Sequence, residues 1–195
     1  MIHRRAKQVD PDEQLVRRIR EGDAAAFSAI VDRHGAGLYR VALAICGNGA
    51  DAEDLVQDTF IAAFEGVAAF AGKAMLRTWL TRILMNLAAQ HRRRESVRKA
   101  ARLGSVSEPA ARQAEGGKDF KIDFHEALNA LEEPFREVVV LRELMGMSYD
   151  EIGEALQIAA GTVESRLFRA RQKLKELLAD YLPPDDVLRS RRSEQ

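Results

Sequence analysis

Charged and hydroxyl side chains gather on one face of a predicted helix near residue 170, and their chemistry suits nucleic acid. Val163, Leu167 and Ala170 recur at steps of four and three, so they form the buried face of that helix. The opposite face carries the candidate DNA contacts: Thr162, Glu164, Ser165, Arg166, Arg169, Arg171 and Lys173. The two hydroxyls, the carboxylate and Arg169 can reach base edges in a major groove, whereas the other three cations suit phosphates.

The residues before this helix predict a second, shorter helix that would hold it at a turn. Ser148, followed three residues later by Glu151, matches a capping box, so a helix is expected to begin at Tyr149. A glycine-containing turn over residues 157–161 follows, and Thr162 is expected to cap the next helix. This order matches a helix-turn-helix, whose second helix enters the major groove of DNA. The same pattern also fits the solvated edge of a helical bundle, so the residues alone leave both interpretations open.

The charges of the chain cancel overall, yet they are distributed unevenly along it. The 195 residues include 30 basic and 30 acidic side chains. Residues 65–104 hold nine cations against two anions, whereas residues 105–161 hold five cations against twelve anions. A basic block of this size offers an electrostatic surface to the phosphates of a nucleic acid, and the acidic block predicts either a protein partner or no partner.

Helical periodicity dominates the sequence, which predicts an all-α protein of two small domains. Hydrophobic residues make up 46% of the chain, and the alternation typical of strands is hard to find. A stretch rich in Gly, Ser, Ala and Pro, residues 101–119, predicts a flexible linker. We therefore expect a helical domain over residues 10–98, a linker over 99–121, a second helical domain over 122–182 and a tail over 183–195.

The first domain is expected to contain helices that break at Gly22 and at the pair Gly35 and Gly37. Trp79 shares an apolar face with Leu87 in the last of these helices, so it is expected in the core. The polar face of the same helix runs through Arg82, Asn86, Gln90, Arg92, Arg93 and Arg94. The cations at its end also suit the negative pole of the helix dipole.

No set of residues in the sequence matches a metal site or a catalytic centre. The single Cys46 excludes an internal disulfide and the four histidines lack zinc spacing, so we expect no metal and no cofactor. Without a glycine-rich phosphate loop or a plausible nucleophile, the protein is not expected to be an enzyme. Asp51, Glu53, Asp54 and Asp58 leave one alternative open, a metal-dependent nuclease or hydrolase. No apolar run approaches membrane-spanning length, so we expect a cytoplasmic protein without membrane insertion.

Two parts of the chain, taken together, match one protein family. The stretch over residues 127–178 resembles region four of the bacterial sigma-70 family. The stretches "DAEDLVQDTFIAAF" and "RTWLTRILMNLAAQHRRR" resemble region two. With only these two regions joined by a short linker, the chain resembles an extracytoplasmic-function (ECF) sigma factor over residues 12–180. The resemblance implies a protein that binds core RNA polymerase and directs transcription initiation at promoters.

The resemblance assigns roles to residues of the first domain. It implies that Asp54, Gln57 and Asp58 bind the clamp helices of the polymerase beta-prime subunit, with the beta flap as a further contact on polymerase. It also implies that the loop "FAGKAM" and the helix after it melt the minus-ten promoter element and capture an unstacked base. The expected minus-ten contacts are Lys73, Arg77, Arg82, Asn86, Arg92 and Arg93. A cationic groove beside stacking surfaces is what single-stranded DNA requires.

The second domain is implied to recognise the minus-thirty-five element through the helix expected to begin at Thr162. Many family members carry a cation where this chain has Glu164, and a glutamate favours the amino group of cytosine. The family also implies an anti-sigma factor, and Glu132, Glu133 and Glu137 are expected to suit docking on polymerase or on that inhibitor. The alternative function is a stand-alone helix-turn-helix regulator that binds DNA without polymerase.

Overall fold

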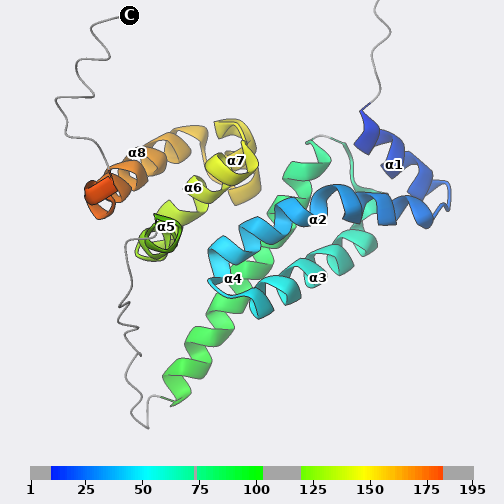
Figure 1. The fold of residues 1–195 in the computed structure, drawn as a ribbon. Helices are drawn as coiled ribbons and strands as arrows, with labels where there is room; N and C mark the ends of the chain where they lie inside the picture. Colours follow the sequence, from blue (N-terminus) through cyan, green and yellow to red (C-terminus); the bar gives the residue numbers. More distant parts are fainter. Residues whose placement is uncertain (1–9, 73, 103–119, 182–195) are drawn as a thin grey trace, which may run out of the picture.

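The computed structural model describes residues 10–72, 74–102 and 120–181, and every regular element within them is a helix, as predicted (Figure 1). The first domain comprises α1 (Pro11–Arg20), α2 (Ala25–Cys46), α3 (Gly49–Gly66), the 3-10 turn η1 (Val67–Ala69) and α4 (Leu76–Arg102). The second comprises α5 (Phe120–Asn129), α6 (Glu133–Met145), α7 (Tyr149–Leu156), α8 (Ala160–Leu177) and the 3-10 turn η2 (Ala179–Tyr181). Lys73, the middle of the expected linker and the expected tail lie outside the described residues.

The first domain is built on three long helices, with α2 packed along α3 and α3 along α4 (Figure 1). Its core consists of the apolar stripes that helical spacing predicts, and the largest fully buried side chains are those of Ile30, Leu38, Val41, Val67, Leu80 and Leu84. The expectation that Trp79 belongs to the core holds in part. Its side chain is half-buried and packs against the edge of the core rather than inside it.

The second domain packs α8 against both α6 and α7. Val163, Leu167 and Ala170 of α8 are buried, together with Ile152 of α7 and Leu141 of α6. The periodicity of α8 therefore predicts its inward face correctly, and the opposite face is left to solvent.

The glycines of α2 do not break the helix, contrary to the sequence-based expectation. α2 continues from Ala25 to Cys46 through both Gly35 and Gly37. A side chain at Gly37 would meet the Met145 sulfur at 3.4 Å, so this glycine lets α6 approach α2 closely. Gly22, by contrast, has φ of +94° and ends α1 as expected.

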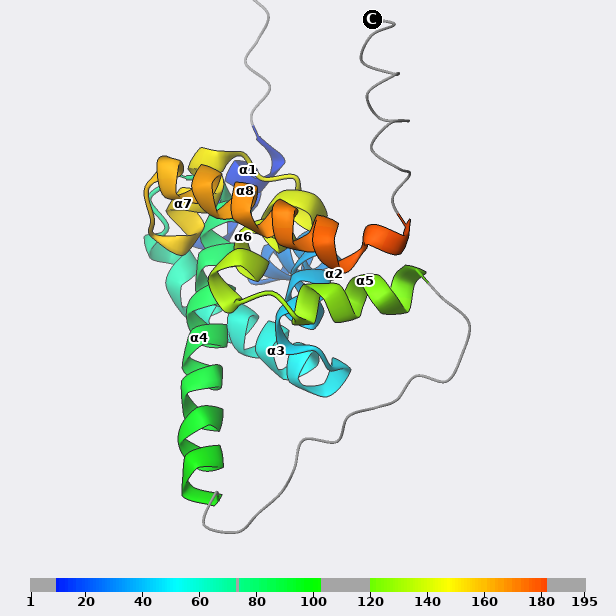
Figure 2. The ribbon, with the colours of Figure 1, turned by 90° about the vertical axis from the view of Figure 1, so that its left-hand side faces the viewer.

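The two domains lie side by side and share one hydrophobic core. α6 packs against α2, and α7 packs against α4, although the two pairs are far apart in the sequence (Figure 2). Buried residues of both domains form one continuous cluster. α4 continues to Arg102, four residues into the expected linker, and its C-terminal end projects beyond the other helices (Figures 1 and 2).

Candidate nucleic-acid interface

The capping box predicted at the start of α7 is present. The Ser148 hydroxyl accepts a hydrogen bond from the Glu151 backbone N–H at 3.2 Å, and the Glu151 carboxylate accepts one from the Ser148 backbone N–H at 2.8 Å. Both bonds satisfy N–H groups that a helix start leaves without an intrahelical partner. The position and direction of α7 are therefore fixed locally.

The turn between α7 and α8 depends on one close approach. Gln157 takes a left-handed conformation, with φ of +57°, and ends α7. A Cβ at Gly153 would lie 2.7 Å from the Ile158 carbonyl oxygen, so only glycine fits there without rearrangement. The turn thus holds α8 at a defined angle to α7, as a helix-turn-helix requires.

The expectation that Thr162 caps α8 is wrong. The helix begins at Ala160, and its N-cap is Ala159, which has no side chain to form a capping bond. Ala159 has an extended backbone, and its carbonyl accepts hydrogen bonds from the N–H groups of Thr162 and Val163, at 2.8 and 3.1 Å. The backbone of the turn therefore starts the helix before the threonine.

The solvent face of α8 begins with a polar and aromatic patch. Glu164, Ser165 and Arg169 are exposed, as the sequence predicts. They line a hollow of about 790 Å³ that also touches Tyr149 and Phe168. Phe168 is 65% exposed and was not among the predicted contacts, although it stands off the apolar stripe of its helix. An exposed aromatic ring of this kind can contact the methyl group of a thymine.

The cations farther along α8 have partners within the chain. Arg171 donates to Glu143 of α6 at 3.0 Å, and this hydrogen bond raises the pKa of Arg171. Lys173 donates to Glu176 at 3.2 Å. Arg166 is half-buried, and its charge partly opposes the burial that raises the pKa of Glu137. Thr162 is also half-buried.

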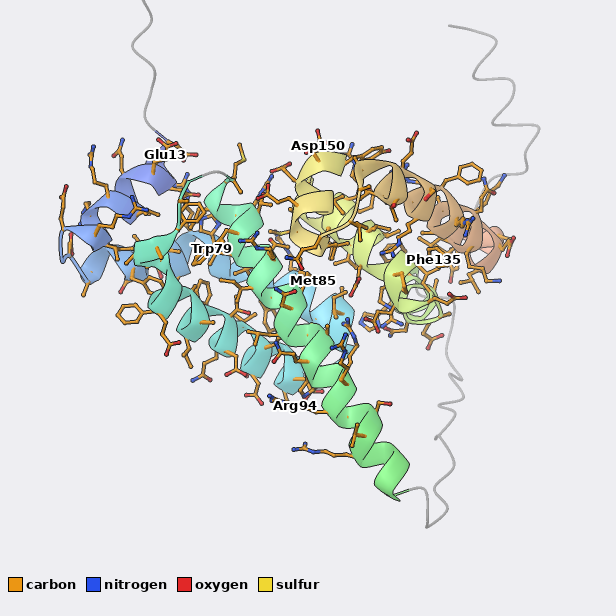
Figure 3. The ribbon with its side chains drawn as sticks, turned by 180° about the vertical axis from the view of Figure 1, so that it is seen from behind. Glu13, Trp79, Met85, Arg94, Phe135 and Asp150 are labelled. Carbon is orange, nitrogen blue, oxygen red and sulfur yellow. The ribbon has the colours of Figure 1, made fainter. Side chains whose placement is uncertain are left out.

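A second candidate surface lies where η1 leads into the loop before α4. A hollow of about 430 Å³ is lined by Phe70, Trp79 and Arg82 and by Glu154 of α7. The rings of Phe70 and Trp79 are tilted by 45° with centroids 5.2 Å apart. Figure 3 shows α4 running across the molecule, with Trp79 near its start, Met85 in its middle and Arg94 toward its projecting end. Asn86 is exposed on α4 but is not among the residues that line this hollow.

An arginine of α1 anchors the start of this loop. Arg20 donates from Nε to the Ala68 carbonyl at 3.1 Å, and its Nη2 donates to the Phe70 carbonyl. These carbonyls belong to the 3-10 turn and its C-cap, which have few intrahelical partners. Arg20 therefore fixes the backbone that presents the Phe70 ring, a role that local sequence patterns do not reveal.

Two of the predicted minus-ten cations are paired with carboxylates of the second domain. Arg77 donates to Glu151 at 2.7 Å and to the Met145 carbonyl at 3.1 Å. Arg92 forms ion pairs with Glu137, at 2.8 Å, and with Glu133. Two carboxylates of the expected acidic docking surface, Glu133 and Glu137, are thus engaged inside the chain, whereas Glu132 is exposed. Arg93 is exposed beyond them.

The pKa values of two carboxyls in these contacts are shifted in opposite directions. Burial raises the pKa of Glu137, and although Arg92 opposes this, the net pKa stays above the ordinary value for glutamate. Burial would also raise the pKa of Glu151. Hydrogen bonds from the Ser148 backbone and from Arg77 outweigh that effect, so the pKa of Glu151 lies below the ordinary value.

The predicted polymerase contacts lie on α3. Asp54, Gln57 and Asp58 are exposed on one face of this helix. Beside them an apolar groove of about 450 Å³ is lined by Phe27, Val31, Gln57, Phe60, Ile61, Phe64 and Glu65. Ile61 is 53% exposed and Phe64 is 56% exposed. Both residues fall outside the buried stripe of α3. An apolar residue outside the buried stripe of its helix is visible in the sequence, and this mismatch could have identified the groove.

In the described part of the chain, no group of three or more His, Cys, Asp or Glu side chains is placed to hold a metal ion. Among the helices of the described residues, none has both the length and the apolar character needed to cross a membrane.

Comparisons with known proteins agree with both halves of this geometry. Residues 30–98 match the Sigma-70 region 2 family, and residues 121–174 match Sigma-70, region 4. The chain is 36% identical over 176 residues to the RNA polymerase sigma factor NccH of Alcaligenes xylosoxydans, which covers 86% of this chain and 94% of the relative. It is 32% identical over 178 residues to the ECF RNA polymerase sigma-E factor of Escherichia coli, covering 84% and 92%.

Solved structures show the same relationship. The sigma factor RpoE of Bartonella quintana, in complex with the anti-sigma factor NepR, matches with a TM-score of 0.68 and 32% identity over 78% of this chain and 96% of that one. CnrH, in complex with the cytosolic domain of CnrY, matches with a TM-score of 0.67 and 31% identity over 88% and 99%. The chain therefore belongs to the sigma-70 family, among its ECF sigma factors. As a member of that family it binds core RNA polymerase and promoter DNA.

Proposed function

We propose that the two domains of this sigma factor divide promoter recognition between them. The first domain binds core polymerase through α3 and contacts the minus-ten element through the loop before α4 and the cationic face of α4. The second contacts the minus-thirty-five element through α8. The protein works in the cytoplasm and supplies no catalytic group, because bond formation belongs to the polymerase.

The observation that carries this division is the exposed face of α8. Glu164, Ser165 and Arg169 stand on the solvent side of a helix whose other side is buried in the domain core. The capping box and the tight turn at Gly153 hold that helix in a helix-turn-helix. Exposed base-reading groups on a rigidly held helix support major-groove recognition.

The polymerase contact is supported by the composition of the α3 surface. Exposed acids and an amide at Asp54, Gln57 and Asp58 adjoin an apolar groove flanked by Ile61 and Phe64. A polar rim beside an apolar centre is the usual anatomy of a protein interface. Contiguous exposed apolar side chains that are rimmed by polar residues mark interaction sites, whereas apolar residues scattered singly over a surface do not.

An anti-sigma factor is part of the proposal. Two structural relatives were solved in complexes with another protein, one named as an anti-sigma factor and one as the cytosolic domain of CnrY. Both resemble this chain over most of its length. A protein that holds the chain in this arrangement would keep it from polymerase.

A titration of core polymerase binding tests the proposal. Phe64→Ser and Asp54→Lys are each expected to weaken binding of the full chain to purified core polymerase, because hydrophobic or charge complementarity is lost at α3. Val97→Ser is the matched control, since Val97 is 70% exposed on the projecting end of α4. Equal affinity of all three variants and the wild type would contradict the placement of the interface on α3.

A further inference from the structure

The surface between the two domains brings carboxylates of one onto cations of the other. Glu133 and Glu137 lie one turn apart on α6, and both pair with Arg92 of α4. Glu151 pairs with Arg77 at the other end of the contact. Both arginines are among the expected minus-ten contacts, where a cation would bind a DNA phosphate, so these glutamates occupy positions that phosphates would take.

The face of α4 that α7 covers is polar, unlike an ordinary core. The described part of the chain has only three buried polar or charged residues: Thr59, Thr78 and Thr81. Thr78 and Thr81 lie on α4 next to Arg77, and the Thr78 hydroxyl lies 3.5 Å from Glu151. A helix face that stayed permanently buried would favour apolar residues there, whereas a face that alternates between protein and solvent keeps polar ones.

The arginines at this contact keep unused hydrogen-bond donors. Within the described residues, Nε of Arg77 and both Nε and Nη1 of Arg92 are buried without a hydrogen-bond partner. A guanidinium group has five N–H donors, and a phosphate can bind two of them at once. The carboxylates therefore leave several N–H donors of these two arginines free for another anionic ligand.

The second domain also reaches the hollow beside the minus-ten loop. Glu154 of α7 lines this hollow together with Phe70, Trp79 and Arg82. A single strand lying along α4 would meet this carboxylate and the body of α7. The second domain thus covers the hollow and also pairs with Arg77 and Arg92 on the same surface of α4. Both contacts would exclude single-stranded DNA.

We infer that α6 and α7 form a DNA-mimicking surface whose partner is the first domain of the same chain. The carboxylates of Glu133, Glu137 and Glu151 hold Arg77 and Arg92 and keep single-stranded DNA off α4 while the chain is free of polymerase. This inference rests on the proposed function, because it takes α4 as the surface for the minus-ten strand. It adds that the chain needs no inhibitor to close over that surface.

The contact has an apolar part that opposes opening. Gly37 of α2 lies against Met145 of α6, and the two domains share one hydrophobic cluster. Neutralising the carboxylates removes the electrostatic part alone, since Arg77 and Arg92 remain intact. Neutralising these carboxylates should therefore leave both arginines available to bind DNA.

The test measures binding of a labelled single-stranded oligonucleotide of mixed sequence to the full chain without polymerase. The double variant Glu133→Gln/Glu137→Gln is compared with Glu126→Gln/Glu132→Gln, which changes the net charge equally at exposed sites of α5 and the α6 N-cap. Loss of the contact should tighten binding by about 5- to 30-fold, which corresponds to one or two kcal/mol. The control should tighten it far less.

A distance measurement separates closure from binding. Dyes on Glu53→Cys and Gln172→Cys, in a Cys46→Ser background, report the separation of the domains by energy transfer. The inference predicts a short separation in the wild type, and a longer one in the double variant and at high salt. An open wild type, or a variant that opens without binding the oligonucleotide more tightly, would overturn it. Transcription with core polymerase tests the proposed function separately. A chain that supports transcription but is open when free would contradict the inference alone, whereas a chain that supports no transcription would contradict the proposed function.

Discussion

Arg77 of α4 and Glu151 of α7 are joined across the two domains at 2.7 Å, and the same carboxylate closes the capping box of α7. One oxygen of Glu151 accepts from Arg77, and the other accepts from the Ser148 backbone N–H. A single side chain therefore links the start of the helix-turn-helix to the surface assigned to the minus-ten element.

Glu151→Gln should lower the free energy of unfolding by about 1–2 kcal/mol at neutral pH, because a partly buried, charge-assisted contact is lost. The side chains of Arg77 and Glu151 are 33% and 22% exposed, so solvent screens the pair only partly. Urea unfolding of both proteins measures the difference. Glu143→Gln, which breaks the exposed pair with Arg171, is the control and should change stability by less than about 0.5 kcal/mol.

The shifted pKa values of Glu151 and Glu137 predict how the stability of the fold depends on pH. The pKa of Glu151 is lowered in the folded state, so its contribution is present above the unfolded pKa and is lost as the pH falls through the folded pKa. The pKa of Glu137 is raised, so stability instead falls as the pH rises from its unfolded to its folded pKa. Carboxyl carbon shifts in NMR should show Glu151 titrating below Glu137. The reverse order would contradict this assignment.

Gly153→Ala should destabilise the second domain by about 1–3 kcal/mol, because the new Cβ would lie 2.7 Å from the Ile158 carbonyl oxygen. Thermal unfolding followed by circular dichroism measures the change. Gly161→Ala is the matched control, since a Cβ there meets nothing within 4 Å. Equal effects of the two substitutions would show that the close approach does not limit the turn.

Local features of the fold could be predicted from the sequence. The capping box at Ser148 and the buried face of α8 depend on residues three or four positions apart, and both are present. The start of α8 was mispredicted because the extended backbone of Ala159, rather than the Thr162 side chain, ends the turn. The break expected at Gly37 was wrong because that glycine serves a contact with Met145, a residue far away in the sequence.

The candidate sites were predictable as sets of residues but not as surfaces. The pairing of Arg92 with Glu137 spans 45 positions, so no periodicity within one helix reveals it. The Arg20 contacts with the minus-ten loop are hidden for the same reason. Phe168 and Phe64 differ, because an aromatic residue off the apolar stripe of its helix is visible in the sequence as a mismatch.

Arg20→Ala should slow promoter opening, because the carbonyls of Ala68 and Phe70 lose their donor and the loop loses its fixed backbone. Permanganate reactivity of unpaired thymines measures opening on duplex templates with core polymerase. Arg17→Ala, an exposed neighbour in α1, is the control. A template melted in advance should rescue the Arg20 variant. A defect of equal size on both templates would place the role of Arg20 elsewhere.

Glu164→Gln should change the preferred base at one position of the upstream element, with a difference of about 1–3 kcal/mol between bases. Phe168→Ala should weaken the preference for a neighbouring thymine, because the apolar contact with the thymine methyl group is lost. Lys173→Ala, in contrast, should lower activity evenly across sequences, since phosphate contacts carry no base information. Transcription from a library of randomised upstream elements measures all three. A uniform loss for Glu164→Gln would remove it from the recognition surface.

The most direct measurement is run-off transcription from a promoter-bearing library with purified core polymerase, with and without this protein, beside a mobility shift of the free protein on the same DNA. The account predicts discrete start sites that depend on the protein and share an upstream and a downstream element, with little binding by the protein alone. Tight, specific binding by the free protein with no new start sites would contradict it and indicate a stand-alone regulator.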